Sequence, residues 1–93
     1  MKAKALIDTR IVYAENAFAE LVLWRLPQPL AGSTHRFKYR LAYVVAGECV
    51  IRYDNEAGKG DHRHIGKRES SYAFVDVDTL LADFQRDIRK ASK

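Results

Sequence analysis

Several residue types and features are scarce in this sequence, and each shortage narrows the class of protein. A single cysteine, Cys49, excludes an internal disulfide framework and is typical of a reducing compartment. No apolar run approaches the ~20 residues of a membrane-spanning helix, so no membrane association is predicted. The basic start, residues 1–4, is not followed by the apolar core of a signal peptide. We therefore expect a cytoplasmic protein.

Length and hydrophobic content predict one domain that spans residues 1–93. The chain contains 47% hydrophobic residues, and no repeat, linker or low-complexity segment divides it. A chain of this size buries roughly 60–65% of its unfolded surface when it folds. One modest core is therefore expected, and a partner would add to its stability.

The net charge of +4 is concentrated in one part of the chain. Residues 35–68 contain eight of the sixteen Lys and Arg residues but only four of the twelve Asp and Glu residues, so this segment carries the whole excess. All three histidines also lie in it. A localised basic field suits a polyanion or an acidic protein partner. Considered alone, the charge is also compatible with a solvated sheet face.

Four segments rich in β-branched and aromatic residues are predicted to be strands: residues 5–13, 17–26, 36–45 and about 49–53. Near-continuous apolarity in the second predicts a central strand covered on both faces, with Trp24 in the core. Pro27 and Pro29 end that strand, because proline cannot donate a hydrogen bond to the ladder.

The third and fourth strands are predicted to form a hairpin. Alternation places Tyr39 on the inward face, and a three-residue loop, residues 46–48, would place Cys49 and Tyr53 inward as well. In this register Arg40 lies opposite Asp54, which gives Asp54 the role of a cross-strand ion-pair partner. The inward tyrosines are then core residues instead of platforms for RNA bases.

The remaining chain is predicted to contain a long connection and a helix. Residues 55–69 read as a glycine-containing connection, and residues 72–75 as a last strand or extended segment. After Asp76 as N-cap, apolar residues follow at helical spacing: Val77, Leu80, Leu81, Phe84 and Ile88. The predicted fold is α+β, a four- or five-stranded, mainly antiparallel sheet with one C-terminal helix packed on it.

Residues 54–64 gather groups suited to proton transfer and phosphate binding. His62 and His64 flank Arg63, and Lys59 lies between two glycines. Histidine exchanges protons near neutral pH, and Arg and Lys donate charged hydrogen bonds to phosphate oxygens. Glycines at 58 and 60 would let backbone N–H groups approach an anion, although the spacing is not that of a P-loop. We interpret this stretch as an RNA-phosphate site.

Three runs in the same region resemble the TumE family, small toxins of type II toxin–antitoxin pairs. They are residues 37–43 (FKYRLAY), 53–56 (YDNE) and 58–64 (GKGDHRH), and the likeness extends to residues 32–35 and 80–84. The resemblance implies growth inhibition by an endoribonuclease-like activity on RNA. It also implies a separately encoded helix-turn-helix antitoxin as partner.

Metal-independent RNA cleavage needs a base for the 2′-OH, an acid for the 5′-oxygen and cations for the charged phosphorus. We assign the base and acid to His62 and His64, the cations to Arg63 and Lys59, and the fixing of a histidine tautomer to Asp61. In an extended segment the two histidines would share a face with Arg63 turned away, whereas in a loop all three could converge. The residues expected to contact the substrate are Arg40, Arg52, Asp54, Asn55, Gly58, Gly60, Lys67 and Arg68.

Other readings stay open. The histidines with Asp54 or Asp61 offer enough ligands for a metal-dependent nuclease, although the leading hypothesis requires no metal or cofactor. The chain could also be a non-catalytic basic module that binds nucleic acid or the antitoxin, with structural histidines and Asn55 in a turn. A homodimer and a toxin–antitoxin hetero-oligomer are both compatible with the sequence.

Overall fold

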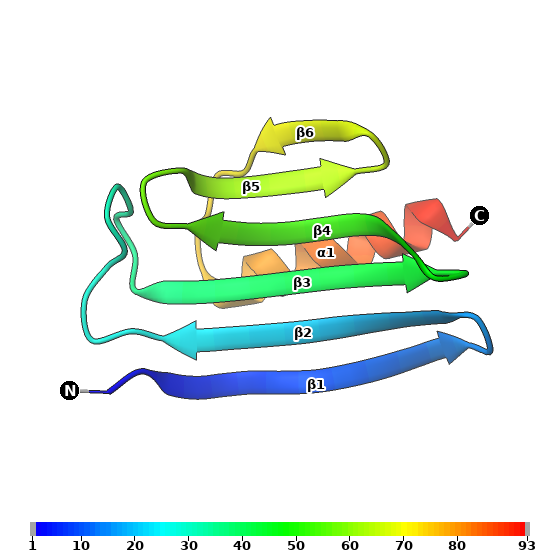
Figure 1. Cartoon of the computed structure of the whole chain (residues 1–93), viewed down its shortest axis with the longest axis horizontal. Coiled ribbons are helices and arrows are strands. Elements are labelled where there is room, and N and C mark those ends of the chain that lie inside the picture. The colour runs from blue at the N-terminus through cyan, green and yellow to red at the C-terminus, as the bar shows by residue number, and fades with distance from the viewer. Residues whose placement is uncertain (1, 93) are drawn as a thin grey trace.

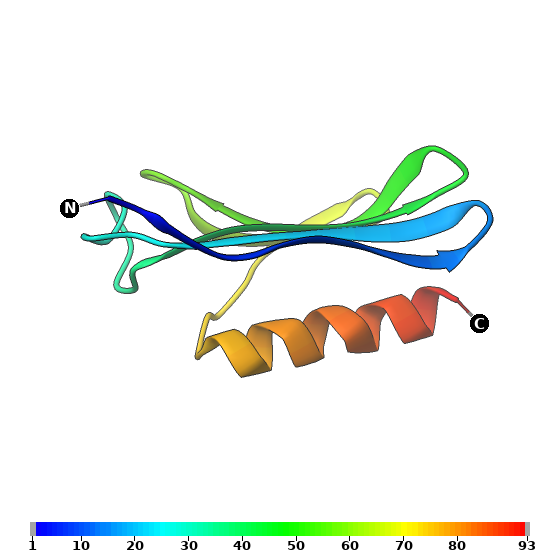
Figure 2. The same cartoon turned by 90° about the horizontal axis from the view of Figure 1, so that it is seen from below.

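The computed structural model describes residues 2–92, so residues 1 and 93, the ends of the predicted domain, lie outside the described residues. Within this range the elements are β1 (Lys4–Ala14), β2 (Ala17–Arg25), β3 (Phe37–Val45), β4 (Glu48–Glu56), β5 (Gly60–Ile65), β6 (Arg68–Ser71) and α1 (Val77–Ala91). The strands form one antiparallel sheet in chain order (Figure 1). Helix α1 covers one face of it (Figure 2).

The predicted α+β class, antiparallel sheet and C-terminal helix are confirmed, but the strand count is wrong. The sheet formed by residues 2–92 has six strands instead of four or five. The segment predicted as a long connection is the end of β4 followed by the β5–β6 hairpin. Gly58, Gly60 and Gly66 have positive φ angles of 79°, 76° and 61° and serve the tight turns of this hairpin region.

The β3–β4 hairpin reaches the predicted register by a different route. Ala46 and Gly47 form a two-residue turn with φ angles of 52° and 79°, as a type I′ turn requires, so the predicted three-residue loop is wrong. A bulge then adds one residue to β4, because Tyr43 pairs with Ile51 while the next residue pairs with Cys49. Beyond the bulge Arg40 lies opposite Asp54, as predicted.

The bulge also changes the environment of the cysteine. Cys49 is exposed instead of facing inward, and its thiol contacts the carbonyl oxygen of Ile51 at 3.4 Å. From Ile51 onward the predicted alternation holds, and Ile51 and Tyr53 are buried.

The core lies between α1 and the sheet. Asp76 caps α1 as predicted, its carboxylate accepting a hydrogen bond from the Thr79 N–H at 2.7 Å. The most buried large side chains of this layer are Leu21, Leu23, Tyr39, Leu41, Tyr43, Ile51, Tyr53, Leu80, Phe84 and Ile88. Trp24 is 37% exposed, contrary to its predicted core position, because it belongs to the face that carries no second layer.

No helix within residues 2–92 has the length and apolar character needed to cross a membrane.

Candidate functional site

The sheet face opposite α1, here called the open face, carries two transverse rows of side chains. Ile51 and Tyr53 point toward the helix. Because successive side chains of a strand point to opposite faces, Arg52 and Asp54 point to the open face. Cross-strand pairing sets out the first row as Asp8, Val22, Arg40, Asp54, His62 and Ser71. The second row consists of Arg10, Glu20, Ala42, Arg52, His64 and Glu69.

His62 and His64 therefore lie side by side on the open face, with Arg63 turned toward α1. This is the arrangement predicted for an extended segment, and it excludes the loop in which all three side chains converge. A cleft of about 150 Å³ joins the two imidazoles to five charged side chains, and its lining residues are Arg52, Asp54, Glu56, Lys59, His62, His64 and Glu69. The structure thus gathers both predicted proton-transfer residues with one of the two predicted cations, Lys59, and with the predicted substrate contact Arg52.

The Nε2 atom of His64 has a potential donor and a potential acceptor within reach. It lies 3.0 Å from Nη2 of Arg52 and 2.9 Å from Oε2 of Glu69. A neutral ring with its proton on Nδ1 accepts from Arg52, whereas a protonated ring donates to Glu69. Each protonation state has a partner, as a proton-transferring group needs. Sequence reasoning missed Glu69, because only the β5–β6 register places it opposite His64.

His62 lies in a different environment from His64. Its Nε2 atom is shielded from solvent and has no hydrogen-bond partner among residues 2–92. Asp54 lies directly across the ladder, and its carboxylate pairs with Nε of Arg52 at 3.3 Å. The predicted ion pair between Asp54 and Arg40 is absent from the described residues. Asp54 pairs instead with Arg52 on the same strand, while Arg40 opposite it is exposed. Arg52 links Asp54 to His64.

Arg63 belongs to a polar cluster between the sheet and α1. Its guanidinium lies 3.7 Å from the carboxylate of Asp87, which is buried on α1, and 6.0 Å from the ring centre of Tyr53. The Tyr53 hydroxyl donates to the same carboxylate. Burial, with this hydrogen bond, raises the pKa of Tyr53 to about 12. Arg63 is therefore separated from the histidine pair by the thickness of the sheet.

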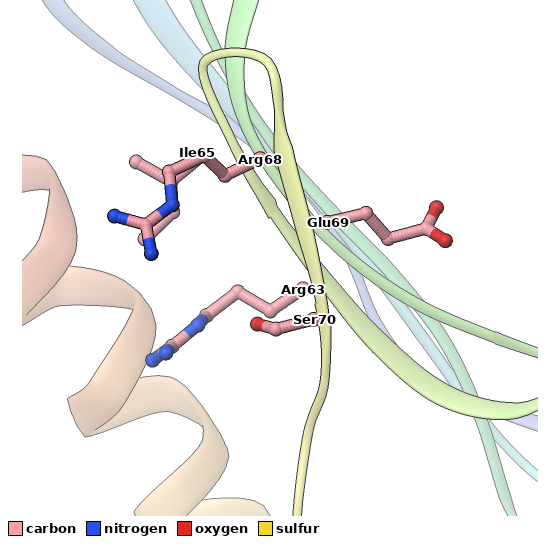
Figure 3. A pocket seen from close by; sticks show the side chains of 5 residues that line it. All are labelled: Arg63, Ile65, Arg68, Glu69 and Ser70. Carbon is pink, nitrogen blue, oxygen red and sulfur yellow. The ribbon is translucent and has the colours of Figure 1, made fainter.

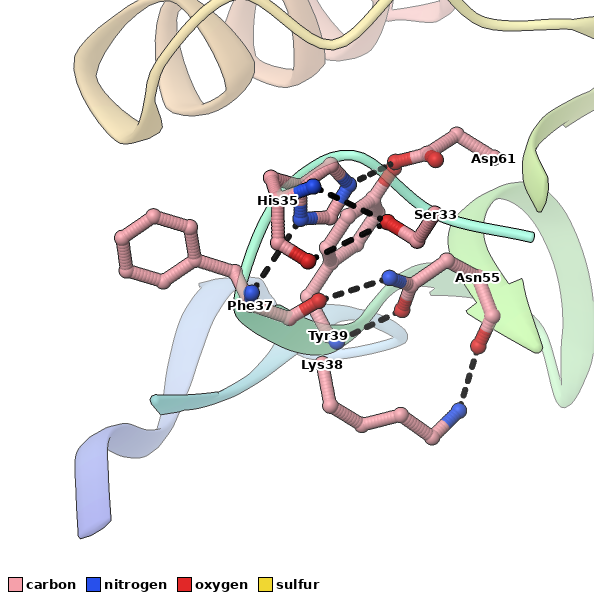
Figure 4. A network of polar contacts seen from close by, with 7 residues as sticks. All are labelled: Ser33, His35, Phe37, Lys38, Tyr39, Asn55 and Asp61. Atoms are coloured by element: carbon pink, nitrogen blue, oxygen red, sulfur yellow. Dashed lines mark hydrogen bonds and ion pairs between the residues drawn. The ribbon is translucent and has the colours of Figure 1, made fainter. Parts of the chain in front are cut away.

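Asp61 also faces the helix side, where it holds His35 instead of His62 or His64 (Figure 4). One Asp61 oxygen accepts from His35 Nε2 at 2.8 Å and from the Tyr39 hydroxyl at 2.6 Å. Nδ1 of His35 accepts from the N–H of Phe37 at 3.1 Å, which fixes the proton on Nε2. Burial, reinforced by Asp61, raises the pKa of Tyr39. Asp61 thus fixes a histidine tautomer in a structural network.

Asn55 is part of the sheet framework instead of a turn. Its side chain is 1% exposed at a point where the β3–β4 backbone pairing has ended. Its amide oxygen accepts from the N–H of Tyr39 at 3.0 Å, and its amide nitrogen donates to the carbonyl of Phe37 at 2.7 Å (Figure 4). Lys38 donates to the Asn55 carbonyl. The amide oxygen and the amide nitrogen of Asn55 are both bonded within the sheet, so this buried side chain is not available to a substrate.

The glycine turn does not present a free anion nest. The N–H of Gly58 donates to the carbonyl of Ala31 at 2.7 Å, and that of Lys59 donates to the carbonyl of Glu56 at 3.2 Å. These donors tie the turn to the β2–β3 loop and to β4. The Lys59 ammonium group lies 3.6 Å from the Glu56 carboxylate on the rim of the open-face cleft.

The last two predicted substrate contacts lie away from the histidines. Lys67 is exposed in the β5–β6 turn. Arg68 points toward α1 beside Arg63 and Ser70, while Glu69 points to the other side (Figure 3). A separate groove of about 300 Å³ is lined by Arg63, Ile65, Arg68, Glu69 and Ser70.

The metal alternative has three of its predicted ligands, His62, His64 and Asp54, along one cleft. Asp61 lies on the opposite face from His62 and His64. In the part of the chain that the structure describes, no group of three or more His, Cys, Asp or Glu side chains is arranged to hold a metal ion.

Comparison with known proteins gives one match. Residues 2–92 match the model of the family described as Toxin TumE. Searches of curated proteins and of solved structures found no match.

Proposed function

We propose, from the premise that this chain belongs to the TumE toxin family, that it arrests growth by cleaving RNA without a metal ion. The observation that carries the proposal is the pairing of His62 and His64 on one uncovered sheet face, in one cleft with Arg52 and Lys59. A toxin of this family has an antitoxin partner, and we propose that the partner is a helix-turn-helix protein. Action on RNA would place the toxin in the cytoplasm.

The two histidines have the properties of a base and an acid. His62, whose side chain lines the cleft, is the candidate acceptor for the 2′-OH proton. The 2′-oxygen attacks phosphorus, a 2′,3′-cyclic phosphate forms, and the bond to the 5′-oxygen breaks. The leaving oxygen takes its proton from His64, whose Nε2 is held by Glu69 when protonated. Each such transfer accelerates cleavage by about 10²–10⁴-fold.

Two cations are available for the charge that develops on phosphorus. Arg52 already contacts His64 and Asp54, so its position is fixed by both neighbours. Lys59 lies at the rim, where its 3.6 Å pair with Glu56 is exposed and easily exchanged for a phosphate oxygen. Arg63 is left out of this mechanism because it serves Asp87 on the other face.

Replacement of each histidine tests the proposal. His62→Gln and His64→Gln are each expected to lower cleavage of a model RNA by purified protein at least 100-fold and to abolish growth arrest. Lys90→Ala, on the exposed end of α1, is the control and keeps full activity. Unchanged thermal unfolding midpoints show that the variants fold. RNA cleavage retained by both histidine variants contradicts the assignment.

The same RNA-cleavage assay distinguishes the proposal from two rival functions. A metal-dependent nuclease loses activity with EDTA and regains it with Mn²⁺ or Zn²⁺, whereas our proposal requires indifference to EDTA. The second rival is a non-catalytic binding module. Such a module binds RNA with a log–log salt slope of about −0.7 per phosphate contacted and forms no product. A 2′,3′-cyclic phosphate end on the product supports attack by the 2′-OH.

A further inference from the structure

β1 is the edge of the sheet farthest from the histidine pair, and it is poorly covered. Figure 1 shows no element along its outer side, and every residue of the strand except Ile7 is exposed. It also carries four of the seven exposed large hydrophobic side chains among residues 2–92, namely Leu6, Ile11, Val12 and Tyr13. An edge with free backbone groups and apolar side chains is a template for another strand.

The other edge differs in length and composition. β6 has four residues, all polar, and ends next to the segment that leads into α1. β1 has 11 residues, and its bulges lie near its two ends, so residues 7–12 pair regularly with β2. The regular part of β1 therefore offers a longer pairing edge than the whole of β6.

The charges of β1 are complementary to one another. Asp8 and Arg10 lie on the open face, in its first and second rows. Arg10 pairs with Glu20 at 3.4 Å and covers the ring of Phe18 at 4.3 Å. Asp8 has no ion-pair partner within residues 2–92. A cation opposite Asp8 on a neighbouring strand would complete this pattern.

Symmetry restricts how two β1 strands can pair. A two-fold axis perpendicular to the sheet keeps both helices on one face and centres the antiparallel pairing on a single residue. Centring on Asp8 or on Arg10 brings two like charges together. Centring on Thr9 sets Asp8 opposite Arg10 of the second copy, and sets Ile7 opposite Ile11. Thr9 then faces its own copy, and cross-strand Thr pairs are favourable.

We propose that the chain forms a two-fold dimer in which the β1 strands of two copies pair antiparallel about Thr9. The dimer joins the two sheets into one, covers the exposed apolar side chains of β1 and extends the Arg10–Glu20 pair to Asp8 of the other copy. Both open faces look in the same direction. The two histidine sites lie roughly 40 Å apart across the joined sheet, at the usual strand spacing.

A charge-reversal mixture tests the pairing. Sedimentation equilibrium of the full-length chain in low salt is expected to give twice the 10.6 kDa chain mass. Asp8→Lys leaves cations at both positions 8 and 10 of each strand, and Arg10→Glu leaves anions at both, so each variant alone is expected to be monomeric. An equimolar mixture restores the Asp8–Arg10 attraction in a new combination, and is expected to sediment as a dimer.

Matched controls separate this result from a general charge effect. Asp78→Lys and Arg89→Glu make the same charge changes on exposed positions of α1 and keep the dimer. If Arg10→Glu fails to fold beside Glu20, the variant is made with Glu20→Gln, which removes that repulsion. A monomeric wild-type chain, dimers of both single variants, or a mixture that stays monomeric overturns the proposal. A wild-type monomer that binds another protein through β1 overturns it too.

Discussion

Glu69 on β6 reaches His64 on β5 across the ladder, with 2.9 Å between Oε2 and Nε2. This contact exists only because the chain turns back once more after β5. The short edge strand β6 thus supplies the proton acceptor for one of the two imidazoles of the candidate site. Its loss is expected to weaken RNA cleavage.

Glu69→Gln is expected to lower the cleavage rate less than about tenfold. The carboxylate holds the His64 ring through a contact of 2.9 Å, but Glu69 is 59% exposed, and exposed pairs contribute about 0.2–1 kcal/mol. Single-turnover cleavage of a model RNA measures the loss. Glu56→Gln, the same change on the cleft rim, leaves the rate unchanged. A loss as large as that of His64→Gln contradicts this positioning role.

Arg52→Ala is expected to lower the cleavage rate about 100-fold or more, the usual loss for one donor to a transition-state oxyanion. Arg52→Lys recovers only part of the rate, because an ammonium group cannot contact Asp54 and a phosphate in the planar fork geometry of guanidinium. Single-turnover cleavage of a model RNA measures both, with Lys90→Ala as the charge-loss control. If Arg52→Ala changes only the affinity for RNA and not the single-turnover rate, Arg52 binds substrate without assisting the reaction.

The parts of the fold that could be predicted from sequence are those with a local apolar signal. Helix α1 is one, since Asp76 and the spacing of its apolar residues mark both its start and its buried stripe. The Arg40–Asp54 register was also predicted, although the loop was not. A two-residue turn with a one-residue bulge gives the same offset as the expected three-residue loop, so the two differences cancel.

β5 and β6 could not be recognised as strands because neither has apolar alternation. Polar residues occupy both faces of β5, and glycines at its turns resemble those of a flexible loop. The separation of His62 and His64 from Asp61 and Arg63 follows from the two-residue period only once a strand is assumed. The burial of Asp87 had a signal that was overlooked, an acid at helical spacing from Leu80 and Phe84.

Asp87→Asn is expected to destabilise the protein without affecting the candidate site. The substitution removes the negative partner of Arg63 between sheet and helix, and unpaired charges there are costly. Since Arg63 is 31% exposed, the loss is expected at about 2–3 kcal/mol, below the range for a fully buried pair. Urea unfolding measures it, and Asp78→Asn at an exposed helix position is the control. A loss under 1 kcal/mol, or lost RNA cleavage by the folded variant, contradicts this structural role.

Tyr53 makes the stability of the fold sensitive to alkaline pH. Burial and the hydrogen bond to Asp87 raise its pKa from 10.0 to about 12, and burial also raises the pKa values of Tyr39 and Tyr72. Above pH 10 the unfolded chain releases these protons while the folded chain retains them, so proton release favours unfolding. The free energy of unfolding is therefore expected to be insensitive to these groups below pH 10 and to fall as the pH rises toward 12.

Urea unfolding at a series of pH values, with phenolate absorbance followed in parallel, measures this dependence. Tyr53→Phe removes one titrating group, so its stability should fall less steeply between pH 10 and 12 than that of the wild type. The substitution also removes a donor to Asp87 and lowers stability at neutral pH, so the slopes are compared and not the absolute values. Equal slopes for Tyr53→Phe and wild type would mean that the Tyr53 hydroxyl titrates alike in the folded and unfolded chains, contrary to its position against the buried carboxylate.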